Sequence, residues 1–224
     1  MAPLLIDVGT RSMPMIAIIG VFIGMTLAME SLGSFAVPGL ESHPGMHFNM
    51  QVVRQIGPVF AAVLVAGRVG CALAAELGGM RTTEQIDAMR TMGVDPIAAI
   101  VVPRVIACTI MTPVLAAICG IAAIASGWCV AVVGQDFSSI VSVANSAWFA
   151  HWWTPIMGLL KATAFGFAIG LFSCYNGYTC RKGAAGVRRA VAGAFVASFL
   201  AIVILNFFLG DFLDTFGNVV LAQR

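Results

Sequence analysis

Five long apolar runs, separated by shorter polar segments, set the pattern of this chain. Crossing the roughly 30 Å hydrocarbon core of a bilayer takes about 20 apolar residues in a helix. The expected spans are residues 13–29, 56–77, 106–133, 153–172 and 190–209. The runs are continuous and lack the two-residue alternation of β-barrel strands. The pattern therefore predicts an all-α integral membrane protein with about five transmembrane helices, the third long enough to tilt or to bend at Pro113.

Composition supports this fold class and indicates how the helices pack. The chain of 224 residues is 60% hydrophobic and only 10% charged, and so few polar groups could not cover the surface of a soluble protein of this length. Glycine is abundant at 24 residues, as expected where membrane helices approach backbone to backbone. No repeat or shift in composition marks a boundary, so we expect a single domain over residues 1–224.

The positions of Lys and Arg predict the orientation of the spans, because these residues are enriched in cytoplasmic loops. Two loops are basic, one through Arg81, Arg90 and Arg104, the other through Arg181, Lys182, Arg188 and Arg189. The segment 134–152 has no Lys or Arg, and its Trp148 and Trp152 adjoin Trp153, as in an interfacial aromatic belt. Both signals place the basic loops and the amino terminus in the cytoplasm and the carboxyl terminus on the outer side.

The most polar stretch lies between the second and third spans, from Glu76 to Arg104. Thr82 and Gln85 have capping-box spacing, and Gly93 followed by Pro96 predicts the end of a helix. Ile86, Met89 and Met92 recur at threefold spacing and form one apolar stripe. The pattern predicts an amphipathic helix of roughly ten residues, which is too short to be stable alone in water and must dock. The docking partner is either the protein's own helix bundle or another protein in the aqueous phase.

Three charges lie within the apolar runs or at their ends: Lys161, Arg68 and Glu76. Lys161 lies eight residues into the fourth span, roughly 12 Å deep at about 1.5 Å per residue. A charge at such a depth costs roughly 2.5–3.5 kcal/mol on insertion scales, so it should face a partner or a wet cavity. For Lys161 and Arg68 two interpretations stay open: contact with lipid head groups along a polar path, or structural pairing with Glu76, Glu30 or backbone carbonyls. Glu76 is interpreted as a boundary residue, with a salt link to the basic loop as the alternative.

Two pairs of glycines and one pair of histidines have spacings that suggest close packing or metal binding. Gly20 with Gly24, and Gly166 with Gly170, predict close helix contacts, more readily within the chain than at a dimer seam. His43 and His47 have H-x3-H spacing but lie in a Pro/Gly-rich loop without a third ligand, so we expect no metal site. The six cysteines form no CxxC pair and are interpreted as small packing residues.

A close resemblance to the MlaE/YrbE permease family is carried by the run GPVFAAVLVAGRVGCALAAELGGMRTTEQIDAMRTMGVDPIAAIVVPRV. It continues through GLLKATAFGFAIGLFSCYNGY and GAAGVRRAVAGAFVAS and covers about residues 20–209. Members of this family are the membrane subunits of ABC transporters that move phospholipids or other lipids together with MCE proteins. A further amphipathic amino-terminal segment is usual in the family, whereas about a dozen residues precede the first expected span here.

The resemblance implies that the segment 78–104 couples the permease to an ATPase. The implied coupling residues are Thr83, Glu84, Gln85, Asp87, Met89, Arg90, Met92, Gly93, Asp95 and Pro96. The implied partners are a separate cytoplasmic ABC ATPase that binds ATP and Mg²⁺, an MCE-type lipid-binding protein on the outer side, and a second permease copy or paralogue. The implied cargo is phospholipid and the implied location is a bacterial inner membrane. No cofactor in this chain and no nucleic-acid partner are expected.

Motifs for catalysis are missing from the sequence, which favours a transport subunit over an enzyme. The chain contains no GxxxxGK[ST] phosphate loop, no GxSxG and no HExxH. Two other classes of function stay open. One is a secondary transporter or channel that needs no ATPase and uses Lys161 and Arg68; the other is a scaffold that only anchors an MCE protein.

Overall fold

The computed structural model describes residues 9, 12–34, 51–134, 153–181 and 183–222, without the side chains of 31–34, 131–134, 153, 154 and 213–222. Within these ranges the chain is helical and has no strand. Five helical stretches are long and apolar enough to cross a membrane. The predicted all-α membrane fold with five spans is therefore confirmed.

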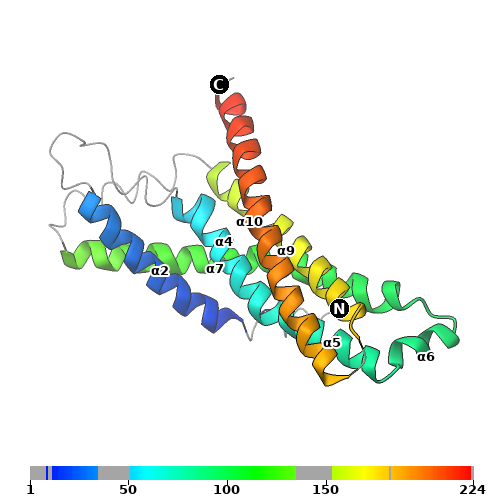
Figure 1. Ribbon diagram of the computed structural model, residues 1–224. Coiled ribbons are helices and arrows are strands. Elements are labelled where there is room, and N and C mark those ends of the chain that lie inside the picture. The colour runs from blue at the N-terminus through cyan, green and yellow to red at the C-terminus, as the bar shows by residue number, and fades with distance from the viewer. Residues whose placement is uncertain (1–8, 10–11, 35–50, 135–152, 182, 223–224) are drawn as a thin grey trace.

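The described elements are connected in a simple up-and-down order (Figure 1). In chain order they are α2 (Met13–Ser34), η1 (Val52–Ile56), α4 (Gly57–Val65), η2 (Ala66–Gly70), α5 (Cys71–Thr82), α6 (Gln85–Thr91), η3 (Ile97–Val101), α7 (Val102–Gly134), α9 (Trp153–Tyr178) and α10 (Ala184–Ala222). The three η segments are π-helical and run directly into α-helices, so the second span is one helical run from Val52 to Thr82.

The helices are longer than the apolar windows that predict them. The third span begins at Ile97 instead of residue 106, and the fifth begins at Ala184 instead of residue 190. Helical hydrogen bonding continues past the membrane boundary as long as each backbone group finds its partner, whereas hydropathy reports only the apolar part. α7 also continues through Pro113, next to which the Thr112 hydroxyl donates to the Cys108 carbonyl at 2.7 Å.

α7 packs against α2, α4 and α9, while α9 also packs against α5 and α10. Figure 1 shows α7 crossing the directions of α2, α4 and α10. Glycines make the closest of these crossings possible. A Cβ on Gly24 would lie 2.0 Å from the Ala123 carbonyl oxygen, and one on Gly166 would lie 2.7 Å from that of Cys108. With Gly20 against Cys119 and Gly170 against Val105, all four predicted packing glycines lie at helix contacts within one chain.

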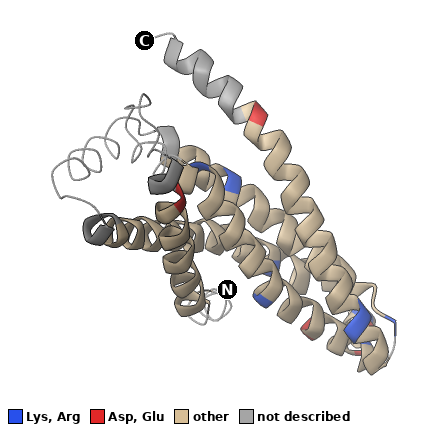
Figure 2. Cartoon of the chain, turned by 60° about the vertical axis from the view of Figure 1, so that its left-hand side comes forward, with Lys and Arg blue, Asp and Glu red and all other residues tan. Residues whose placement is uncertain are grey.

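The two ends of the bundle differ in charge. Figure 2 shows few charged residues along the helices and several Lys and Arg where α10 begins. α6 lies at that same end, far from the carboxyl-terminal part of α10 (Figure 1). The fold thus sets the short polar helix apart from the apolar body.

Candidate functional site: the polar segment between the second and third spans

α6 folds back on α5 through a two-residue turn. α5 ends at Thr82, and Glu84 precedes α6 in the left-handed region with φ 60°. Across the turn, Arg81 Nη1 donates to Asp87 Oδ1 at 2.9 Å, and these two charged groups form an ion pair. The ion pair closes a compact helical hairpin at the end of the bundle.

The predicted capping box of Thr82 and Gln85 is wrong. The Thr82 hydroxyl donates to the Gly79 carbonyl at 2.8 Å, and the Thr83 hydroxyl donates to the same oxygen at 3.0 Å. Since α5 extends through Thr82, these hydroxyls bond to their own helix instead of capping the next one. α6 starts at Gln85 without a side-chain cap and spans seven residues, fewer than the ten expected.

The end of α6 has the predicted glycine termination. Gly93 has φ +77°, and its N–H donates to the Arg90 carbonyl at 3.1 Å, while the Val94 N–H donates to the Met89 carbonyl at 3.1 Å. This pair of bonds is a Schellman motif. Asp95 Oδ1 then accepts the Ile97 N–H at 3.0 Å and so caps the helical run that leads into α7.

The single apolar stripe predicted for α6 divides into a buried and an exposed part. Ile86 is fully buried and Met89 is half-buried, whereas Met92 is 70% exposed. A step of three residues falls about 60° short of a full helical turn, so two such steps rotate Met92 away from Ile86. Met92 is followed by Val94 and Ile97, which are also exposed. We call these three residues the apolar tip.

α6 is attached to the end of α9 as well as to α5. Arg90 Nη2 donates to the Tyr178 hydroxyl, and the Arg90 guanidinium lies 5.9 Å from the centroid of the Tyr178 ring. Tyr178 is the last residue of α9, where the second basic loop begins. The two loops that the charge pattern places on one side of the membrane therefore lie together.

An ion pair links α5, which precedes this polar segment, to α7, which follows it. Arg104 Nη2 of α7 donates to Glu76 Oε2 of α5 at 3.0 Å. Arg104 is 7% exposed, and its Nη1 is buried without a hydrogen-bond partner among the described residues. A salt link from Glu76 to the basic loop is the alternative that the sequence leaves open for this residue, and its partner from that loop is Arg104. The available signal was that the two opposite charges flank the polar segment at its two boundaries.

The other predicted charged residues occupy different environments. Lys161 is 1% exposed, and its Nζ lies 3.8 Å from the point that a Cβ on Gly210 of α10 would occupy. Arg68 is exposed on η2. Because Glu76 contacts Arg104, the hypothesis that Glu76 pairs with Arg68 or Lys161 gains no support from this geometry. His43, His47, Trp148 and Trp152 lie outside the described residues.

Comparison with known proteins shows similarity to membrane permeases along nearly the whole chain. The family model described as Permease MlaE matches residues 4–211. A probable ABC transporter permease protein of Rickettsia prowazekii is 40% identical over 207 residues, which are 92% of this chain and 80% of that protein. The intermembrane phospholipid transport system permease protein MlaE of Haemophilus influenzae is 34% identical over 208 residues, 90% of this chain and 77% of that one.

Proposed function

The chain belongs to the MlaE permease family, and from this premise we propose that it is the membrane subunit of an ABC transporter for phospholipid or a related lipid. It would move lipid between the membrane and an MCE-type partner, and a separate ATPase would drive it. The printed name of the Haemophilus relative, which specifies intermembrane phospholipid transport, supports the choice of cargo.

The observation that carries the proposal is the apolar tip on an ordered hairpin. The buried side chain of Ile86 anchors α6 to the bundle. The Arg81–Asp87 contact joins α6 to α5, and the Arg90–Tyr178 contact joins it to α9. A surface held in place in this way and exposing Met92, Val94 and Ile97 suits an apolar groove on a partner protein, because methionine adapts its shape to such grooves. The exposed polar residues Thr83, Glu84, Gln85 and Asp95 would surround this contact.

Movement of α6 would reach the membrane through the two helices that flank it. ATP binding would bring two ATPase subunits together, and each would displace the α6 seated on it. α5 and α7 would move as a unit because the Glu76–Arg104 ion pair joins them. In this scheme the charged end of the bundle faces the cytoplasm, the carboxyl terminus lies on the outer side, and the membrane is a bacterial inner membrane. A second copy or a paralogue would complete the transport path, with Lys161 and Arg68 as candidate head-group contacts.

Charged substitutions in the apolar tip test the coupling assignment. In the double variant Met92→Glu, Val94→Glu both side chains are exposed, so the fold should persist while the apolar contact is lost. We expect native mass spectrometry of the tagged chain, gently extracted from its own membrane, to show loss of the ATPase subunits. Lipid transfer should fall at least about tenfold, since tenfold corresponds to only about 1.4 kcal/mol.

Ala185→Glu is the matched control, because Ala185 is exposed at the same end of the bundle but outside the polar segment. It should retain the ATPase. Retention of ATPase and transfer in the Met92/Val94 variant would refute the coupling assignment. Transfer that follows an ion gradient and needs no ATPase would favour the secondary-transporter alternative.

A further inference from the structure

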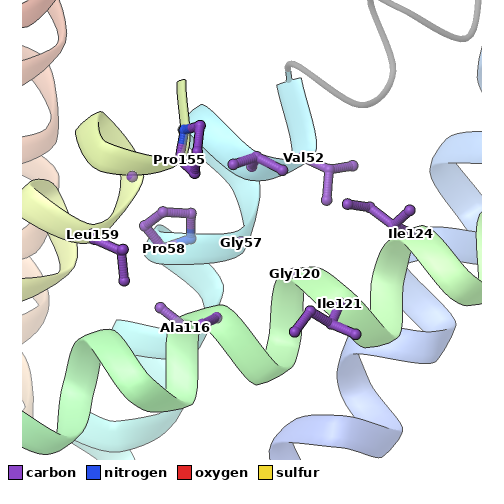
Figure 3. Close-up of a pocket in the computed structure, with 12 residues that line it drawn as sticks. Val52, Gly57, Pro58, Ala116, Gly120, Ile121, Ile124, Pro155 and Leu159 are labelled. Carbon is purple, nitrogen blue, oxygen red and sulfur yellow. The ribbon is translucent and has the colours of Figure 1, made fainter. Parts of the chain in front are cut away.

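An apolar pocket of about 230 Å³ lies where η1, α4, α7 and α9 meet (Figure 3). Its walls include Val52, Pro58, Gly120, Ile124, Pro155 and Leu159. All twelve lining residues are Val, Ile, Leu, Ala, Pro or Gly, so no side chain in the wall can donate or accept a hydrogen bond. The pocket is made by the first turns of the second and fourth spans and the second half of the third. It therefore lies in the half of the bundle away from α6.

Glycines both bring these helices together and leave the space between them. A Cβ on Gly158 would lie 2.5 Å from the Val53 carbonyl oxygen, so α9 and η1 are in close contact there. Gly120 is also buried, yet a Cβ on it would meet nothing within 4 Å. The missing side chain of Gly120 is thus part of the empty volume.

The rim of the pocket faces the surroundings of the bundle. Ile121 and Leu159 line the pocket and are both exposed, whereas Gly57, Pro58 and Ala116 on its inner side are buried. Because these residues belong to helices that are long and apolar enough to cross a membrane, we expect hydrocarbon at this apolar rim. The pocket is open at the exposed face of the bundle and closed toward its interior.

We propose that this pocket binds one acyl chain of a lipid from the surrounding membrane. An apolar protein cavity of about 150 Å³ stays dry and takes up apolar ligands, so a larger one inside a membrane should fill with hydrocarbon. Its lining offers nothing to a phosphate or glycerol group, which leaves the chain as the part that enters. The proposal rests on the membrane spans and holds whatever the transported cargo is.

Filling the pocket from Gly120 tests the proposal. The series Gly120→Ala, Gly120→Val and Gly120→Leu adds apolar volume where the structure has open space, so each variant should fold. Ala125→Leu is the control, because Ala125 is exposed on the same helix and does not line the pocket. The thermal midpoint of every variant is measured first, and the smaller substitutions remain informative if Leu proves too large.

The probe is a phosphatidylethanolamine with a diazirine in the middle of one acyl chain, added in small molar excess to the delipidated protein in detergent. After irradiation, we expect adducts concentrated on peptides covering 52–58, 116–124 and 155–159. Their yield should fall stepwise along the Gly120 series, at least about tenfold at Leu, and stay unchanged in Ala125→Leu. Adducts spread equally over the exposed face of α10, or unchanged in Gly120→Leu, would overturn the proposal. Cross-links from the pocket to a second copy of the chain would overturn it too. Lipid transfer is not a readout here, so the result is independent of the proposed transport function.

Discussion

At the scale of single residues, the ion pair of Arg104 and Glu76 has an unequal environment on its two sides. The Arg104 side chain is almost fully buried, whereas that of Glu76 is 55% exposed. A buried guanidinium without its carboxylate would keep its desolvation penalty and lose its compensation. The exposed carboxylate alone would simply be hydrated. The ion pair therefore stabilises the protein mainly by offsetting the desolvation penalty of the buried Arg104 guanidinium.

This asymmetry predicts different effects of removing each partner. Glu76→Ala should lower the free energy of unfolding by about 1–3 kcal/mol, the range for leaving a buried hydrogen-bond donor unsatisfied. Arg104→Met removes the buried charge, so Glu76 no longer has a charge to compensate. This substitution should lower the free energy of unfolding by less than Glu76→Ala does. Thermal unfolding of the purified protein in detergent measures both.

A double-mutant cycle decides whether the pair itself is responsible. In the Arg104→Met background, Glu76→Ala should have little further effect, because the charge that it would strand is already gone. Additive losses in the double variant would contradict this account.

At the scale of elements, glycine positions determine how closely α2 approaches α7. Replacing glycine by alanine in a helix normally stabilises it, by up to about 1 kcal/mol. Gly24→Ala should do the opposite and cost about 1–3 kcal/mol, as expected for overpacking, because its Cβ would lie 2.0 Å from the Ala123 carbonyl oxygen. Backbone atoms cannot move aside as a flexible side chain does.

Gly67→Ala provides the comparison, measured by the same thermal unfolding. Its Cβ would lie 3.5 Å from the Phe195 ring, an ordinary contact. The thermal midpoint should stay the same or rise in Gly67→Ala and fall in Gly24→Ala. Equal behaviour of the two variants would show that α2 does not depend on this close approach.

The sequence predicted elements better than their junctions. The end of α6 at Gly93 was predictable because a left-handed residue after a helix strongly favours glycine. The start was not, because Thr82 can cap a new helix or bond back to the old one, and only the length of α5 decides between them. For Glu76 a salt link to the basic loop was predicted only as an alternative. Its partner within that loop could not be predicted, since the pair joins residues 28 positions apart through the packing of α5 and α7.

At the scale of the whole molecule, the number and order of the spans followed from hydropathy, because length and apolar character suffice to predict a membrane helix. The arrangement of the spans did not, since every span is apolar on several sides and gives little periodic signal. The apolar pocket depends on this arrangement. Gly120 looks in the sequence like any other glycine of a membrane helix, and its open side is set by the second and fourth spans, which line the rest of the pocket.

The orientation of the bundle stays a prediction and can be measured with single cysteines in a cysteine-free background. Thr83→Cys and Ala185→Cys lie at the charged end, and Ser142→Cys lies in the segment without Lys or Arg. An impermeant maleimide should label Ser142→Cys in right-side-out vesicles and the other two in inverted vesicles, because basic loops stay in the cytoplasm. The reverse pattern would place α6 on the outer side, where no ATPase could reach it.

The length of α7 has a mechanical consequence. Its 33 residues make a continuous rod of about 50 Å, against roughly 30 Å for the hydrocarbon core. The rod begins directly behind α6 and η3 and ends beyond the apolar pocket. A rotation of only about 5° about its first turn would displace the far end by about 4 Å, close to the width of an acyl chain. α7 therefore has the dimensions of a lever arm, which turns a small tilt at one membrane face into a displacement of molecular size at the other.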